Sequence, residues 1–200
     1  MGLLPRADRP ALRNGHGAAS SWLTVNPMTT TPTLPGSGLV LRPIDAGDGP
    51  ALLAILHKPE VSRWWGDPSD DDDPTWPVGD DPDTVKFAIE VDGRVVGLVQ
   101  YSEESDPMYR HAGIDIFLDP TLHRRGLGRE AVRTLARYLF SVRKHHRIVI
   151  DPAAQNHRAI SAYAAVGFRT VGVLREYERN PDGTGWHDGL LMELLVSELN

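Results

Sequence analysis

The chain contains no cysteine. It therefore has no disulfide, no thiolate nucleophile, no acyl-cysteine intermediate and no zinc site built on cysteine. A cysteine-free composition is typical of a reducing compartment, so we expect a cytoplasmic protein.

The sequence also lacks a long apolar run. Its longest stretches, such as 51–56 or 190–196, which Glu193 interrupts, are far shorter than the roughly 18 residues that a membrane-spanning helix requires. The first residues mix Arg, Pro, Gly, Ser and Thr and contain no apolar core typical of a secretory signal. We therefore expect a soluble protein with a disordered leader over 1–38, a native start at Met28 and a single domain over 39–197.

Positive charge is in short supply, since 21 Lys and Arg oppose 27 Asp and Glu and give a net charge of -6 at pH 7. Nucleic acids and anionic membranes both require a surplus of Lys and Arg, so we expect neither as a partner. The acidity is local, because eight Asp and no Lys or Arg lie between Asp67 and Asp83. Without those eight charges the chain has a net charge of +2.

Apolar periodicity predicts a mixed α/β domain. Two strand-like runs are joined by Asp92-Gly93, a dipeptide that favours a type I′ hairpin turn. The predicted strands cover 39–43, 84–91, 94–101, 112–118, 148–150, 168–174 and 190–196, and the predicted helices follow Asp45 and cover 126–142 and 156–166.

A segment rich in glycine and arginine, Arg124-Arg125-Gly126-Leu127-Gly128-Arg129, follows a predicted strand and opens a helix. Glycines let the backbone approach an anion closely, and a helix start offers unpaired N–H groups, so the segment suits phosphate. Eight Lys or Arg against Glu130 alone over 123–147 favour a ligand with several phosphates. The Walker pattern is excluded because no lysine follows the glycines, and a Rossmann pattern is excluded because residues 119–125 separate them from the strand.

A second segment runs from Asn156 to Phe168 and reads Asn-His-Arg-Ala-Ile-Ser-Ala-Tyr-Ala-Ala-Val-Gly-Phe. On a helix, Asn156, Ala159 and Tyr163 project toward one side, which brings an amide and a phenol near each other. A phenol within hydrogen-bond reach can protonate a leaving thiolate, although a tyrosine on an isolated helix is more often structural.

Together the two segments resemble the Gcn5-related N-acetyltransferase (GNAT) superfamily, with its Arg/Gln-x-x-Gly-x-Gly/Ala loop and its Asn-x-x-Ala-x-x-x-Tyr-x-x-x-Gly-Phe helix. The resemblance covers about 39–195, and His123 stands where the family usually has Gln or Arg. It implies an α/β (α+β) fold: a central mixed, mostly antiparallel sheet with a splayed pair of strands and helices on both faces.

The resemblance also implies acetyl-CoA as cosubstrate, with no metal. Carried over by position, the groups that hold its pyrophosphate are Arg124, Arg125, Gly126, Leu127, Gly128 and Arg129. Ile116 and Leu118 would pair their backbone with the pantetheine arm as an added strand does. Asn156 would contact the same arm, and Tyr163 would protonate the departing sulfur.

Within the superfamily the chain looks most like the aminoglycoside 6'-N-acetyltransferases, on segments 61–66, 113–116 and 151–160. This implies direct acetyl transfer to a primary amine of a small polycation, an aminoglycoside, by a monomer or homodimer, and with it antibiotic resistance. Acetylation of a protein N-terminus or of a siderophore precursor stays open, since those branches share parts of the set. A non-catalytic module that senses acyl-CoA is the alternative of another class.

Four residues are candidates for the acceptor side. Asp115 interrupts an apolar run, and an unpaired buried carboxylate is costly, so it either faces a cleft as the base for the acceptor ammonium or is structurally satisfied. Asp151 follows a strand and either binds the acceptor or forms a turn. Trp64 and Trp65 stack on sugar rings or join the core, one exposed and one buried. The segment Asp67–Asp83 either steers cations to this cleft or is a solvated insertion.

Overall fold

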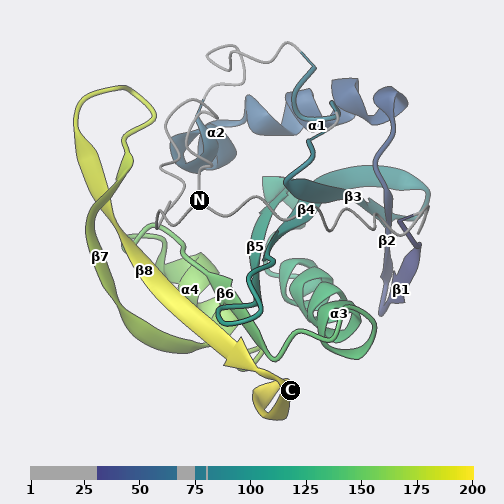
Figure 1. The fold of residues 1–200 in the computed structure, drawn as a ribbon. Coiled ribbons are helices and arrows are strands. Elements are labelled where there is room, and N and C mark those ends of the chain that lie inside the picture. The colour runs from purple at the N-terminus through teal and green to yellow at the C-terminus, as the bar shows by residue number, and fades with distance from the viewer. Residues whose placement is uncertain (1–30, 67–74, 80) are drawn as a thin grey trace, which may run out of the picture.

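A computed structural model of the chain describes residues 31–66, 75–79 and 81–200, and its strands form one sheet (Figure 1). The eight strands are ordered β1-β2-β3-β4-β5-β6-β8-β7, and only β5 and β6 run parallel. Their bounds are β1 Leu34–Gly36, β2 Leu39–Pro43, β3 Thr84–Val91, β4 Arg94–Glu104, β5 His111–Leu118, β6 Arg147–Ile150, β7 Arg169–Arg179 and β8 Trp186–Leu195. The predicted mixed, mostly antiparallel sheet is confirmed.

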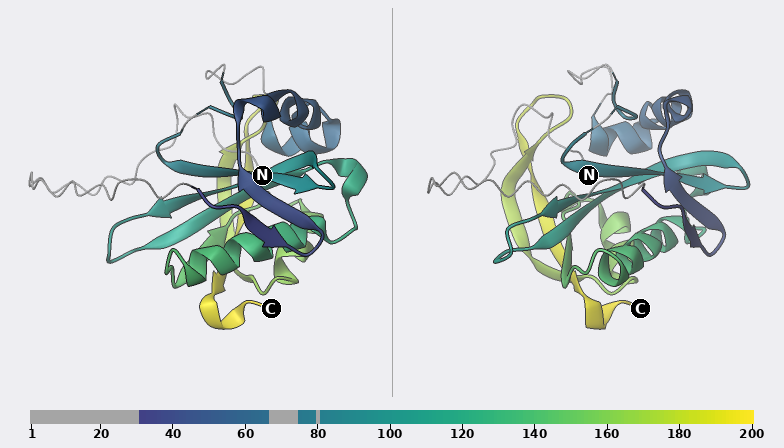
Figure 2. Two further views of the ribbon diagram at one scale, coloured as in Figure 1. Left: turned by 90° about the vertical axis from the view of Figure 1, so that its right-hand side faces the viewer. Right: turned by 45° about the vertical axis from the view of Figure 1, so that its right-hand side comes forward.

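Helices cover both faces of this sheet, as predicted (Figures 1 and 2). On one face, helices α1 (Gly49–Leu56) and α2 (Pro59–Trp65) pack against Leu98 and Phe117. On the other, α3 (Leu127–Ser141) and α4 (His157–Ala164) pack against the larger core around Ile114. The sheet therefore separates two hydrophobic cores, one under α1 and α2 and one under α3 and α4.

The four-residue periodicity of α3 explains its position. Ala131, Leu135 and Leu139 recur every fourth residue and are fully buried against the sheet. Arg129 and Arg137 lie on the exposed side. Burial of one apolar stripe against a sheet supplies most of the stability of such a helix.

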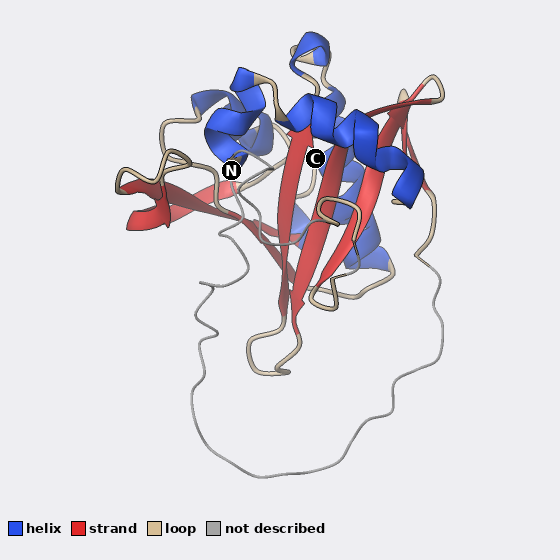
Figure 3. Cartoon of the chain, turned by 90° about the horizontal axis from the view of Figure 1, so that it is seen from above, coloured by secondary structure: helices blue, strands red, loops and turns tan. Residues whose placement is uncertain are grey.

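The sheet splays between β5 and β6. These strands pair only at Ala112 with Ile148 and at Gly113 with Val149, although β5 continues to Leu118. From residue 114 onward, β5 has β4 on one edge and no described strand on the other. Figure 3 shows the strands in two groups that run at an angle to each other. The predicted splayed pair is thus confirmed, and it leaves a strand edge open to a ligand.

The sequence predicts the hairpin turn at Asp92-Gly93 correctly but underestimates the length of strands β7 and β8. The turn at Asp92-Gly93 has positive φ at both residues, 49° and 73°, as a type I′ hairpin needs. Strand β7 continues to Arg179, past its predicted end at 174, and β8 begins at Trp186, before its predicted start at 190; the two pair through two register shifts. Most of β7 is exposed on both faces, so its sequence lacks the alternation that marks a strand.

The predicted leader boundary needs correction. Strand β1 lies inside the segment expected to be disordered, and it pairs with β2 through Leu34 and Leu41. Leu34 also packs on the larger core, so the fold begins before residue 39. Met28 lies outside the described residues, as do 67–74 and 80 of the acidic segment. None of the described helices is long and apolar enough to cross a membrane.

Candidate active site

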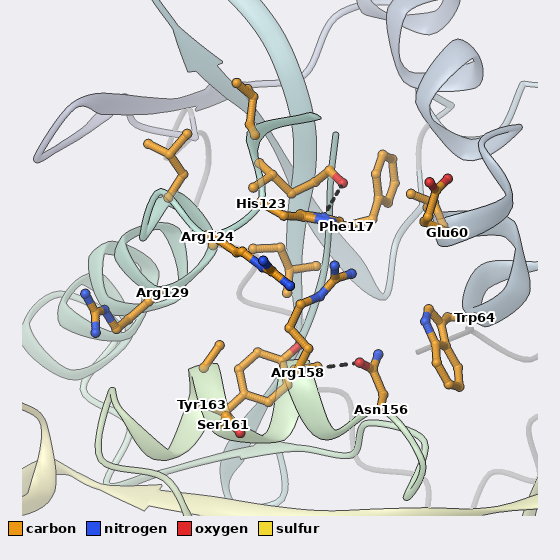
Figure 4. A pocket seen from close by; sticks show the side chains of 18 of the residues that line it. Glu60, Trp64, Phe117, His123, Arg124, Arg129, Asn156, Arg158, Ser161 and Tyr163 are labelled. Atoms are coloured by element: carbon orange, nitrogen blue, oxygen red, sulfur yellow. Dashed lines mark hydrogen bonds between the residues drawn. The ribbon is translucent and has the colours of Figure 1, made fainter. Parts of the chain in front are cut away.

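A cavity of about 400 Å³ opens where β5 and β6 diverge (Figure 4). Its walls come from α2, the carboxyl half of β5, the loop that opens α3, and α4. The lining includes eleven residues expected at the site: Trp64, Trp65, Ile116, Leu118, Arg124, Gly126, Leu127, Gly128, Arg129, Asn156 and Tyr163. It does not include Arg125, Asp115 or Asp151.

The loop before α3 is shaped to hold an anion. Arg124 and Gly126 both have positive φ, 65° and 80°, which turns the backbone twice within three residues. Gly126 begins the helix with no side-chain cap, so the N–H groups of the first turn are left for a ligand. No described acidic residue pairs with Arg124 or Arg129. Of the residues predicted to hold a pyrophosphate, Arg124, Gly126, Leu127, Gly128 and Arg129 line the cavity, whereas Arg125 is exposed outside it.

The cavity walls formed by β5 and by the start of α4 carry the residues predicted to contact the pantetheine arm. Ile116 and Leu118 line the cavity along the open edge of β5. Asn156 lines it too, but its Oδ1 accepts a hydrogen bond from the backbone N–H of Ala159 at 3.2 Å and so caps α4. Its side-chain NH₂ group and the second lone pair of Oδ1 remain to contact the arm, so the predicted role of Asn156 is compatible with its capping role.

Tyr163 lies in the wall of the cavity and is only 5% exposed. Burial raises the pKa of its phenol well above the usual range, and the negative charges of Asp115 and Asp151 raise it further. The phenol is therefore protonated at neutral pH and can act as a proton donor. The same effect shows that both carboxylates lie near Tyr163, although neither lines the cavity.

Asp115 belongs to the sheet face covered by α1 and α2. Side chains alternate along a strand, so Asp115 shares its face with Phe117, which packs beneath those helices. Gln100 lies directly opposite on β4, is 1% exposed, and donates a hydrogen bond from Nε2 to Asp115 Oδ2 at 3.2 Å. This partner gives Asp115 a defined orientation.

The two tryptophans differ in their neighbours. Trp65 packs edge-on against Phe117, with ring centroids 5.0 Å apart, and tilts against Trp76 at 6.5 Å. Trp64 has the guanidinium of Arg63 stacked 4.7 Å from its ring centre, and its side chain lines the cavity. Both side chains are half-buried, so the expected contrast between an exposed and a buried tryptophan is wrong. Trp76 places the described end of the acidic segment against Trp65.

With this geometry in view, the comparison with protein families is decisive. The model of the acetyltransferase (GNAT) domain matches residues 38–169. The chain belongs to the GNAT family. The predicted resemblance is confirmed.

Named relatives of this GNAT chain act on amines. It is 29% identical to spermidine N(1)-acetyltransferase of Escherichia coli K12 over 89 residues, which are 44% of the chain and 47% of that enzyme. It is 27% identical to aminoglycoside N(6')-acetyltransferase type 1 of Klebsiella pneumoniae over 166 residues, covering 72% of the chain and 79% of that enzyme. The chain thus spans about half the length of the first relative and most of the second.

A solved GNAT structure shares the fold. AAC(6')-Ib in complex with paromomycin and acetyl-CoA superposes with a TM-score of 0.63 at 24% identity, over 81% of this chain and 96% of that one. At that identity the likeness concerns the fold alone.

Sequence reasoning did not predict three ionisable residues of the cavity lining as site groups, namely Glu60, His123 and Arg158. Figure 4 shows Glu60 on the α2 side and Arg158 on the α4 side. His123 lies with Nε2 3.2 Å from the carbonyl oxygen of Leu118, and burial together with the nearby charge of Arg158 lowers its pKa. Arg158 occupies an unspecified position of the family motif, so only the folded chain reveals its direction. Among the described residues, no cluster of His, Asp and Glu could hold a metal.

Proposed function

We propose that this GNAT protein transfers an acetyl group from acetyl-CoA to a primary amine of a small polycationic acceptor, with aminoglycosides as the leading class. The observation that carries the proposal is the cavity at the splay. One end has the uncapped start of α3 with Arg124 and Arg129, and another has Trp64 and Glu60. An anionic donor and a cationic acceptor would thus enter a single cavity from two differently charged sides.

The residues present fit acetyl-CoA. The positive φ at Arg124 and Gly126 opens a backbone cradle of the kind that phosphates occupy. The free edge of β5 at Ile116 and Leu118 offers main-chain groups to an extended amide-containing arm. When bound, acetyl-CoA supplies an acetyl group already activated as a thioester.

The chain's own groups would move two protons. Asp115, directly or through one water, takes a proton from the acceptor ammonium, which frees the nitrogen lone pair to form the amide bond. Tyr163 gives its phenolic proton to the leaving sulfur as the thioester bond breaks. The nitrogen loses a second proton as the amide forms, and this proton restores the Tyr163 phenol, while the proton held by Asp115 leaves to solvent. The nitrogen attacks the thioester directly, and the chain has no cysteine to form an acyl intermediate.

Two features support an aminoglycoside acceptor. The match to an aminoglycoside acetyltransferase extends over 72% of the chain. The Trp64 side chain lines the cavity, and an aromatic face suits a sugar ring better than a linear chain. A polyamine is the second candidate, because the spermidine acetyltransferase is 29% identical over the segment it matches.

An acceptor panel tests the proposal, with free thiol release as the readout. Kanamycin, spermidine, a peptide with a free N-terminus and a hydroxamate-precursor amine are compared at equal concentration. We expect the highest kcat/KM with kanamycin. A higher kcat/KM with spermidine or the peptide would show that the acceptor is not an aminoglycoside, while the proposed acetyltransferase activity would stand. Binding of CoA by calorimetry without turnover of any amine would instead favour the acyl-CoA sensor.

A further inference from the structure

Two arginines reach into the cavity from different elements. Arg124 comes from the loop before α3 and Arg158 from the first turn of α4, and Figure 4 shows their guanidinium groups pointing toward one another. No residue of the described chain forms an ion pair or hydrogen bond with the side chain of either. Two like charges that converge without a counter-ion favour an anion between them.

The charge of Arg158 is unfavourably placed at the start of α4. A helix N-terminus carries partial positive charge, so a cation in the first turn is destabilising, and the first turn of α4 has no acidic residue to offset it. Arg158 also lies close enough to His123 for its charge to lower the pKa of that imidazole. Arg158 is exposed at the cavity, and the fold gains little from its charge, so its guanidinium is open to an anionic ligand.

We infer that Arg158 binds phosphate oxygens of the donor, as a second cationic arm opposite Arg124. The inference rests on the proposed use of acetyl-CoA and adds a residue outside the loop that the family motif assigns to phosphate. A guanidinium matches phosphate because its parallel N–H groups make paired, charge-assisted hydrogen bonds. The acceptor class is cationic, so the donor is the anion that Arg158 meets.

Calorimetry with CoA compares the wild type with Arg158→Gln. The control is Arg137→Gln, which removes the same charge from an exposed position on α3 outside the cavity. We expect CoA to bind Arg158→Gln roughly tenfold or more weakly and the control within about twofold, from the usual strength of a charged hydrogen bond. Equal affinity of the wild type and Arg158→Gln overturns the inference. A wild type that binds no CoA contradicts the proposed function itself.

Thermal unfolding distinguishes this role from a structural one. Removing a cation from the start of α4 should leave the melting temperature without ligand unchanged or slightly higher, while the rise caused by CoA shrinks. A melting temperature that falls without ligand shows a structural role for Arg158 and counts against the inference. Glu60→Gln tests whether Arg158 acts by pairing with Glu60 across the cavity. An equal loss of CoA affinity in Glu60→Gln would overturn the inference, because removing a carboxylate from the cavity should not weaken an anion held by Arg158.

The phosphate involved is identified with shortened donors. If the loss in Arg158→Gln persists with 3′-dephospho-CoA, Arg158 binds the pyrophosphate, and if the loss disappears, it binds the 3′-phosphate. Both results support a phosphate role. An equal loss of kcat/KM with S-acetylpantetheine, which has no phosphate, overturns it. Arg158→Lys should recover part of the affinity, because it keeps the charge and loses the paired geometry.

Discussion

Gln100 and Asp115 lie opposite each other on neighbouring strands, and the Gln100 amide donates a 3.2 Å hydrogen bond to the Asp115 carboxylate. Gln100 is almost fully buried, so this bond is sheltered from water. A donor that contacts the ionised carboxylate favours the charged form over the neutral form. For the base proposed at Asp115, this bond makes Gln100 a positioning residue that orients the carboxylate.

Replacement of Gln100 by Met keeps the volume and removes the donor. We expect the acidic limb of the kcat/KM profile to move to higher pH, because the ionised carboxylate loses a hydrogen-bond donor. Asp115→Asn should lower the rate near neutral pH and abolish that limb. In the double variant the Gln100 change should add little, because its effect passes through the carboxylate. A pH profile unmoved in Gln100→Met would show that Asp115 does not depend on this contact.

Tyr163→Phe tests the proton donor. The ring is buried and packs near Phe168, with centroids 6.1 Å apart, so the variant should fold with nearly unchanged stability. We expect kcat to fall on the order of a hundredfold with little change in KM for acetyl-CoA, the usual range for loss of general acid catalysis. With an acetyl thioester of an aromatic thiol the difference should narrow, because that thiolate leaves without a proton. A variant with full kcat would assign proton donation to another group.

Local chemistry made much of the fold predictable. The positive φ at Asp92 and Gly93, the buried stripe of α3 and the glycine turn at Gly126 each depend on a few adjacent residues. Short-range constraints of this kind are written in the sequence, and the structure reproduces them. The family motif added the splay, which no local pattern indicates.

Other features depend on contacts between distant segments. Strand β1 has three residues and includes Pro35, so only its pairing with β2 identifies it as a strand. Asp115 lies in a strand buried on both faces, and the sequence does not say which of the two cores its carboxylate meets. Arg158 and Glu60 become cavity residues only because α4 and α2 meet across the splay.

A partly buried ion pair lies at the base of helices α1 and α2. Arg42 on β2 donates two hydrogen bonds to Asp48, at 2.8 and 2.6 Å, and a third to Glu90. Asp48 is 5% exposed and precedes α1, so the pair fixes where α1 leaves the sheet. Arg42 lowers the pKa of the Asp48 carboxyl.

Asp48→Asn should lower the free energy of unfolding at pH 7 by about 2 kcal/mol, because Arg42 loses its charged partner. Since the pKa of Asp48 is lowered in the folded chain, its contribution is present above the ordinary carboxyl pKa and is lost as pH falls through the lowered value. Urea unfolding at pH 7 and pH 3 should thus show the difference between variant and wild type shrinking in acid. Asp45→Asn is the control, since Asp45 is exposed and contacts Arg42 only at 3.6 Å. If Asp48→Asn lowers the free energy of unfolding equally at both pH values, the loss comes from altered packing and not from the ion pair.

A second buried network lies at the far end of α3. His145 is 3% exposed, and its Nε2 lies 2.6 Å from Glu103 Oε1, while Arg143 contacts the same carboxylate. His145 Nδ1 meets no hydrogen-bond partner in the described chain. Leaving a buried nitrogen lone pair without a hydrogen-bond partner costs less free energy than leaving a buried, charged N–H without one. His145 is therefore neutral, with its proton on Nε2, which donates to Glu103. Burial accordingly lowers the pKa of His145.

This lowered pKa predicts acid sensitivity. The unfolded chain takes up a proton on His145 near the ordinary histidine pKa, whereas the folded chain resists it, so stability is full above that pKa and falls as pH drops from 7 to 5. His145→Gln retains an amide donor for Glu103 and cannot titrate. Its free energy of unfolding, measured by urea at several pH values, should decline less steeply over this window than that of the wild type. His146→Gln, at the exposed neighbouring position, should keep the wild-type slope, and a His145→Gln slope equal to it would place the acid-sensitive group elsewhere.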